Sequence, residues 1–246
     1  MGGRDVIFDF MHNLAFSKGI SQQSDMLTLQ KMIVGCVSCR KTTTEEDKDG
    51  NDYVVTLRKG TEVKVDAKTR RPGCSRYWGS CPELALELWS VRPGGKYHVP
   101  AGKEKAGWTL DESKETDLML FTFHPEDSLD VYLVSFQLLR LAFLRFFTAW
   151  CGSVNGTKRG RYRREIQETN RENCCWESEC VFVPVTVVFA AIEDVMQGKL
   201  ILPETAHAGE TPPTKSSTES CKPKPHLDLF SDLPDEPPNL AYHVRR

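Results

Sequence analysis

Between Asp52 and Asp66 the chain reads DYVVTLRKGTEVKVD, and this stretch decides the fold. Its first half is β-branched or aromatic, and its second half alternates polar with apolar side chains, so both halves favour β-strands. Arg58-Lys59-Gly60 supplies a short turn with glycine at a position where a positive φ costs little. The stretch therefore predicts an antiparallel hairpin.

Counting outward from the turn pairs Thr56 with Glu62, Val54 with Lys64, and Asp52 with Asp66. Because side chains alternate along a strand, Asp52, Glu62, Lys64 and Asp66 are expected on one face. Three carboxylates that lie close together repel one another, and a divalent cation such as Mg²⁺ or Mn²⁺ would compensate that repulsion. The alternative is a charged hairpin whose side chains are simply solvated.

Asp52 followed by Glu62-Val63-Lys64 resembles the Asp…Glu-x-Lys core of the PD-(D/E)XK nuclease superfamily, with Asn51 in place of the usual proline. The resemblance implies an α/β, restriction-endonuclease-like mixed central sheet flanked by helices. It also implies a Mg²⁺-dependent deoxyribonuclease that hydrolyses phosphodiester bonds. Asp52 and Glu62 would hold the metal and Lys64 would orient the attacking water, with Asp66 and Glu87 as further metal ligands.

The order of the later segments extends this resemblance to phage and bacterial nucleases of the superfamily. A strand over 83–90 carries Glu87, Gly107-Trp108 follows, and a buried strand is expected over 116–123. The resemblance covers roughly residues 50 to 195. An acid from an early helix often joins the metal shell in this superfamily, and the choice between Asp9 and Asp25 stays open.

The rest of the chain is expected to form one nuclease domain over 1–202 and a disordered tail over 203–246. The spacing of apolar residues predicts a helix over 24–37. Further along, we expect a strand over 131–136 followed by a buried helix from 137, a strand over 180–184 and a helix over 185–197. Arg140 and Arg145 interrupt the apolar run at 131–151, which favours a buried helix over a membrane span. The tail is rich in Thr, Pro, Ser, Lys and Glu and cannot bury a core.

Composition is that of an ordinary soluble chain: 246 residues, 39% hydrophobic, 27% charged, with a formal charge of −2. The N-terminal residues contain no run of signal-peptide type, so we expect a cytoplasmic protein of a bacterial or phage-infected cell. Two local basic stretches are predicted to contact DNA phosphates in spite of the balanced total charge. Their members are Lys68, Arg70, Arg71, Arg76, Lys158, Arg159, Arg161, Arg163 and Arg164. For the first stretch, a solvated loop is the open alternative.

The nine cysteines allow a metal centre or free thiols in a reducing compartment. Cys36, Cys39, Cys74 and Cys81 are candidates for a four-sulfur zinc site. Cys151, Cys174, Cys175 and Cys180 are candidates for the iron–sulfur cluster that certain nucleases of the superfamily carry.

A short motif interrupts the tail. His226-Leu227-Asp228-Leu229-Phe230 resembles the bacterial sliding-clamp-binding peptide Gln-Leu-Ser/Asp-Leu-Phe, with His226 in place of glutamine. Leu229 and Phe230 would anchor in an apolar pocket of the clamp, which would recruit the nuclease to sites of DNA replication or repair. Two alternatives remain open: a non-catalytic DNA- or clamp-binding module on the same fold, and a zinc-stabilised interaction protein.

Overall fold

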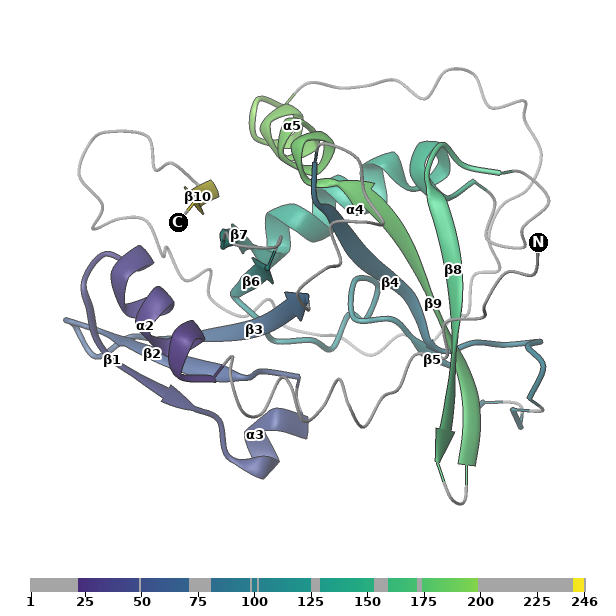
Figure 1. The fold of residues 1–246 in the computed structure, drawn as a ribbon, viewed down its shortest axis with the longest axis horizontal. Helices are drawn as coiled ribbons and strands as arrows, with labels where there is room; N and C mark the ends of the chain where they lie inside the picture. Colours follow the sequence, from purple (N-terminus) through teal and green to yellow (C-terminus); the bar gives the residue numbers. More distant parts are fainter. Residues whose placement is uncertain are drawn as a thin grey trace, which may run out of the picture.

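The computed structural model describes residues 22–48, 50–70, 81–97, 99–100, 102–124, 129–152, 159–171, 174–198 and 241–245. The described part is an α/β structure with two sheets and four helices (Figure 1). In chain order the elements are α2 (Gln22–Met32), β1 (Cys36–Lys41), α3 (Thr44–Lys48), β2 (Tyr53–Leu57), β3 (Glu62–Arg70), β4 (Glu83–Val91), β5 (Lys105–Ala106), β6 (Leu118–Phe123), β7 (Asp130–Ser135), α4 (Phe136–Cys151), β8 (Arg163–Arg171), β9 (Cys174–Pro184), α5 (Val185–Met196) and β10 (Ala241–Arg245).

The predicted hairpin lies inside a six-stranded sheet with the order β1-β2-β3-β6-β7-β10. β3 and β6 run parallel, whereas all other neighbours in this sheet are antiparallel. Parallel neighbours cannot be joined by a tight turn. The chain between β3 and β6 accordingly leaves the sheet and supplies β4 and β5 to the second sheet.

The second sheet is antiparallel and has the order β5-β4-β9-β8. β8 and β9 form a long two-stranded hairpin that extends beyond the end of β4 in Figure 1. α4 and α5 pack against each other beside this sheet. The second sheet therefore stands next to the first, and residues from both can meet where they approach.

Two hydrophobic cores lie on opposite faces of the six-stranded sheet. One core contains Leu29 of α2 together with Val63 and Val65 of β3. The other core packs Phe121 of β6 against β4, β9, α4 and α5, with Leu86 at its centre. Because strand side chains alternate, Asp66 and Lys68, further along β3, lie on the opposite face from those valines, the face toward the second sheet.

α4 is the helix expected from residue 137, and it begins at Phe136. The hydroxyl oxygen of Ser135 accepts a hydrogen bond from the Leu138 N–H at 3.4 Å, and Gly152 ends the helix with φ 79°. Its side chains at Leu139, Ala142 and Phe143 are fully buried. Among the described residues, no helix is long and apolar enough to span a membrane.

The predicted strands over 83–90, 116–123 and 131–136 and the predicted helix over 185–197 are present, with no bound shifted by more than two residues. Other expectations are wrong in part. The helix expected through residue 37 ends at Met32, and β1 follows it; β9 is much longer than the expected strand over 180–184. The tail, expected to be disordered throughout, contains β10, which pairs with β7.

Leu139→Ala is expected to lower the free energy of unfolding by about 2–5 kcal/mol, because it removes a fully buried side chain between the second sheet and α4. Leu141→Ala, on the exposed side of the same helix, is the matched control and should change it by less than about 0.5 kcal/mol. Urea denaturation of both variants measures the difference. Equal losses would show that α4 buries a different face.

Candidate active site

The hairpin of β2 and β3 has the predicted register. Thr56 pairs with Glu62 and Val54 with Lys64. At Asp52 the ladder ends irregularly, because the Asp52 N–H donates to the Val65 carbonyl at 2.9 Å. The Asp52 carboxylate then accepts a hydrogen bond from the Ala67 N–H at 2.8 Å, which brings it beside Asp66.

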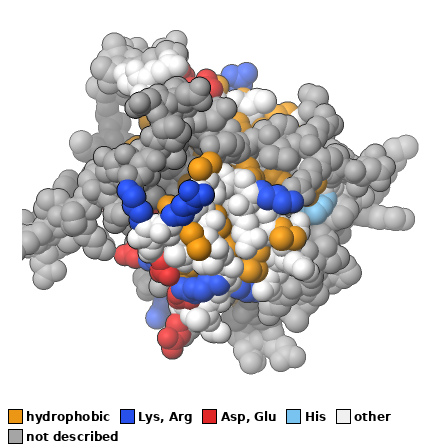
Figure 2. Space-filling view, turned by 90° about the vertical axis from the view of Figure 1, so that its left-hand side faces the viewer, with side chains coloured by type: hydrophobic (Ala, Val, Ile, Leu, Met, Phe, Trp, Pro, Cys, Tyr) orange, Lys and Arg blue, Asp and Glu red, His pale blue; other side chains and the backbone are white. Residues whose placement is uncertain are grey.

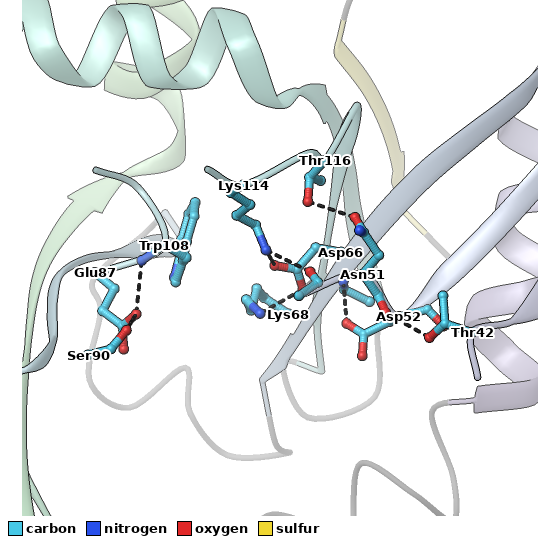
Figure 3. A network of polar contacts seen from close by, with 12 residues as sticks. Thr42, Asn51, Asp52, Asp66, Lys68, Glu87, Ser90, Trp108, Lys114 and Thr116 are labelled. Carbon is cyan, nitrogen blue, oxygen red and sulfur yellow. Dashed lines mark hydrogen bonds and ion pairs between the residues drawn. The ribbon is translucent and has the colours of Figure 1, made fainter. Parts of the chain in front are cut away.

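Two ammonium groups contact the Asp66 carboxylate (Figure 3). Lys68, two residues further along the same face of β3, lies 2.6 Å from Asp66 Oδ1. Lys114, from the loop before β6, lies 2.8 Å from Asp66 Oδ2. That oxygen is fully buried and contacts Lys114 without accepting a well-aligned hydrogen bond. Asp66 is therefore held from two sides by positive charge, and the Asp52 carboxylate lies beside it.

The two aspartates titrate in opposite directions. Burial, followed by the negative charge of Asp66, raises the pKa of the Asp52 carboxyl to about 6. Burial also acts to raise the pKa of Asp66, but the positive charges of Lys68 and Lys114 outweigh it and lower that pKa. At neutral pH the structure therefore holds two adjacent carboxylates, one of which would gain strongly from a further positive charge.

Backbone and side-chain bonds fix the segment that leads into Asp52. The Thr42 hydroxyl donates to the carbonyls of Asn51 and Asp52 at 2.7 and 3.0 Å. The buried Asn51 side chain accepts from the Thr116 hydroxyl at 2.8 Å. Asn51, where the superfamily pattern has proline, thus ties the start of β2 to the loop that carries Lys114.

Glu87 reaches the same region from β4 of the second sheet. Its Oε2 accepts hydrogen bonds from the Ser90 hydroxyl at 2.7 Å and from the Trp108 N–H at 3.1 Å. Its negative charge is one of those that raise the pKa of Lys68. Gly107 is required here, since a Cβ at that position would lie 2.2 Å from the Glu87 carbonyl oxygen. Figure 3 shows Lys68 between Glu87 and the aspartates, so Glu87 is an outer member of the group.

The expectation that Glu62 and Lys64 join this cluster is wrong in its geometry. Lys64 pairs instead with Glu115 at 2.9 Å, at the surface. Glu62 is 58% exposed, lies 3.9 Å from Arg40, and is about 13 Å from Asp66 along the strand. Both residues do occupy the predicted register; they are too far toward the turn to meet Asp52.

Asp25 of α2 does not join the acids either. Its carboxylate accepts a hydrogen bond from the Tyr53 hydroxyl at 3.1 Å, and burial followed by Asp25 raises the pKa of Tyr53. Tyr53 belongs to the core under α2, on the face opposite Asp66. Asp9, the other candidate, lies outside the described residues.

The basic residues divide into two groups. Arg70 continues the line of Asp66 and Lys68 along β3, and its guanidinium lies over the Phe182 ring at 5.6 Å. Arg163 stacks on the same ring at 4.1 Å. Arg163 also pairs with Glu83 at 3.0 Å and with Glu165. Arg164 donates to Glu179 at 2.8 Å and to the Cys151 carbonyl at 3.2 Å, so it holds β8 against β9 and the end of α4.

Of the other predicted DNA-binding residues, Arg159 and Arg161 precede β8, and the Arg161 guanidinium lies 5.8 Å from the Tyr162 ring. Arg71, Arg76 and Lys158 lie outside the described residues. On the face shown in Figure 2, the Lys and Arg side chains of the described residues form separate groups with hydrophobic and other side chains between them. Of the predicted DNA-binding residues, Lys68 on β3 contacts Asp66 directly, and Arg70 follows it on the same strand.

The cysteines are dispersed over the described structure. Cys36 and Cys39 belong to the core under α2, whereas Cys81 packs against the other core. The Cys81 sulfur lies 3.6 Å from the Thr186 hydroxyl oxygen. Cys175 is exposed near the tip of the β8–β9 hairpin, about 17 Å along β9 from Cys180. Burial raises the pKa of the Cys151 and Cys180 thiols to about 12.

These positions argue against both cysteine-based metal sites. Cys81 cannot join Cys36 and Cys39 across the sheet, and one cluster cannot reach both ends of β9. Among the described residues no group of three or more His, Cys, Asp or Glu side chains is arranged to hold a metal ion. Cys74 lies outside the described residues.

Searches against protein-family models, curated proteins and solved structures find no match to this chain. Any function must therefore be argued from the site itself.

The sequence contains a signal for Lys68, which the sequence analysis above assigns to DNA binding. Asp66-Ala67-Lys68 is itself an Asp-x-Lys sequence on β3, four residues after Glu62-Val63-Lys64 and on the same face of the strand. Lys114 had no local signal, because only the tertiary fold brings its loop beside Gly50 and Asp66.

Asp52→Asn tests the electrostatic description through pH. The folded protein keeps the Asp52 proton up to pH about 6, whereas the unfolded chain releases it near pH 4. The folded state therefore binds more protons between these values, and the contribution of Asp52 to stability falls as pH rises. From pH 4 to pH 7 the stability of Asp52→Asn relative to wild type should increase by about 2 kcal/mol.

Urea denaturation at pH 4, 5, 6 and 7 measures this change. Glu112→Gln, at an almost fully exposed carboxylate, is the control and should show no such trend. A difference between Asp52→Asn and wild type that stays constant with pH would contradict the raised pKa.

Proposed function

We propose that this chain is a Mg²⁺-dependent nuclease that hydrolyses phosphodiester bonds of DNA at a site formed by Asp52, Asp66 and Lys68. The observation that carries the proposal is the buried pair of adjacent aspartates with a lysine two residues beyond the second. That arrangement agrees with the Asp…(Asp/Glu)-x-Lys pattern of the PD-(D/E)XK superfamily better than Glu62 and Lys64 do. The central position of this hairpin in a mixed sheet supports a restriction-endonuclease-like fold.

The donor set fits a hard divalent cation. Mg²⁺ is commonly held by one or two carboxylates, with waters and substrate phosphate oxygens completing its shell. Asp52 and Asp66 offer such a pair, and burial and the charge of Asp66 raise the pKa of Asp52 in spite of the positive charge of Lys68. Asp52 and Asp66 would hold the ion, and Glu87 would act from further out.

The bound ion would supply Lewis acidity toward the phosphate and a lowered pKa for water. The residues of the chain would perform the positioning. Lys68, whose side chain is 40% exposed, is placed to donate a hydrogen bond to the attacking water or to a phosphate oxygen. Arg70 would bind a neighbouring phosphate of the DNA backbone, since its guanidinium lies at the Phe182 ring further along the same face of β3. Arg163 lies at the same ring from β8 and would bind a phosphate in exchange for its pairs with Glu83 and Glu165.

A non-catalytic DNA-binding module on this fold is the second candidate. One observation favours it: Lys68 and Lys114 already contact both oxygens of the Asp66 carboxylate without a metal ion. The two candidates differ in whether Mg²⁺ and Lys68 are required for strand cleavage.

Lys68→Met is expected to reduce Mg²⁺-dependent cleavage of DNA by at least about a hundredfold, because the group that orients water or phosphate is lost. Lys64→Met, four residues earlier on the same face of β3, is the matched control and should cleave within a few-fold of wild type. Single-turnover cleavage of end-labelled DNA, with Mg²⁺ or with EDTA, measures both rates.

Two other outcomes have definite meanings. Loss of cleavage in Lys64→Met alone would place the site at residues 62–64, as the sequence analysis predicts. An absence of cleavage by wild-type protein on single-stranded, duplex and branched DNA would favour the non-catalytic module.

The clamp-binding peptide is a separate part of the proposal, since His226-Leu227-Asp228-Leu229-Phe230 lies outside the described residues. A peptide of residues 222–234 is expected to bind the bacterial sliding clamp. Replacing Leu229 and Phe230 with alanine should weaken binding at least tenfold, because anchors of this kind contribute about 2 kcal/mol or more. Fluorescence anisotropy of the two labelled peptides tests this, and equal binding would remove the clamp from the proposal.

A further inference from the structure

The ammonium group of Lys114 is nearly buried beside the Asp66 carboxylate. The Lys114 side chain is only 6% exposed. The ammonium lies 2.8 Å from Asp66 Oδ2 and donates to the Gly50 carbonyl at 2.6 Å. Gly50 has φ +79°, and a Cβ there would lie 2.6 Å from the Lys114 nitrogen, so this position admits no larger side chain without displacing the ammonium.

The two oxygens that hold Lys114 are of the kind that Mg²⁺ prefers. Carboxylate and backbone carbonyl oxygens are hard ligands, and here they are occupied by a fixed monovalent cation. Lys68 differs, because its 40% exposed side chain can turn toward solvent or substrate. Lys114 is nearly buried, and its ammonium is held by both Asp66 Oδ2 and the Gly50 carbonyl.

We propose that Lys114 is a fixed counter-ion that keeps the affinity of the site for divalent cations low until a substrate phosphate supplies further negative charge and oxygen ligands. The inference rests on the proposed nuclease function. Lys114 is a positioning residue in this scheme: it occupies Asp66 Oδ2, so the metal would bind Asp52 and, once Lys68 turns away from it, Asp66 Oδ1. Substrate and cation then load together, which would limit cation binding by the DNA-free protein.

The test is direct titration of Mn²⁺, a spectroscopic substitute for Mg²⁺, by electron paramagnetic resonance at pH 7.5. Wild-type protein, Lys114→Met and Lys103→Met are compared without DNA and with a phosphorothioate duplex that resists cleavage. Lys103 is exposed on the loop before β5, so its variant removes the same charge at a distance. Methionine keeps the length and much of the volume of the lysine side chain.

Without DNA, Lys114→Met should bind Mn²⁺ roughly tenfold more tightly than wild type or more, because a positive charge next to the ion is removed. Lys103→Met should match wild type. In wild type the duplex should tighten Mn²⁺ binding at least tenfold, and in Lys114→Met it should do so to a smaller extent. Unchanged or weaker Mn²⁺ binding by folded Lys114→Met would overturn the inference.

The wild-type measurement decides the matter if Lys114→Met does not fold, as judged by circular dichroism. Equal Mn²⁺ affinity with and without DNA would then overturn the inference, and DNA-dependent affinity would support it. The nuclease proposal fails separately, if wild-type protein with DNA neither binds Mn²⁺ nor cleaves.

Discussion

The site depends on the contact between one buried carboxylate, Asp66, and two ammonium groups from different parts of the chain. A buried charge is expensive unless it is paired, and removing one partner of a buried pair is strongly destabilising. Lys68 and Lys114 provide that pairing at 2.6 and 2.8 Å. The loop before β6 is therefore bound to β3 by charge as well as by the parallel pairing of β3 and β6.

β3 combines two functions that its alternating sequence separates. Val63 and Val65 pack under α2, while Asp66, Lys68 and Arg70 face the second sheet. Each strand neighbour of β3 delivers one partner: β2 starts just after Asp52, and β6 follows the loop that carries Lys114. A one-residue slip of β3 would bury the lysines and expose the valines, so the hydrophobic pattern also fixes the register of the polar group.

The sequence was sufficient for the local part of this arrangement. The turn at Arg58-Lys59-Gly60 and the alternation of β3 give the correct hairpin register, and Asp52 and Asp66 do meet. Glu62 and Lys64 contact Arg40 and Glu115 rather than the two aspartates, because alternation defines a face without saying where along that face the acids gather. The position of Lys114 could not be predicted, because it depends on a crossover of about fifty residues between β3 and β6.

The cysteines illustrate the same limit, since close spacing in sequence places Cys175 and Cys180 far apart when the chain between them is extended. β10 has a consequence of another kind. It completes the edge of the six-stranded sheet, but the ribosome makes it about a hundred residues after β7. At ordinary rates of synthesis, β7 remains an open strand edge for roughly 5–20 s, a period in which nascent chains on one messenger could pair with each other.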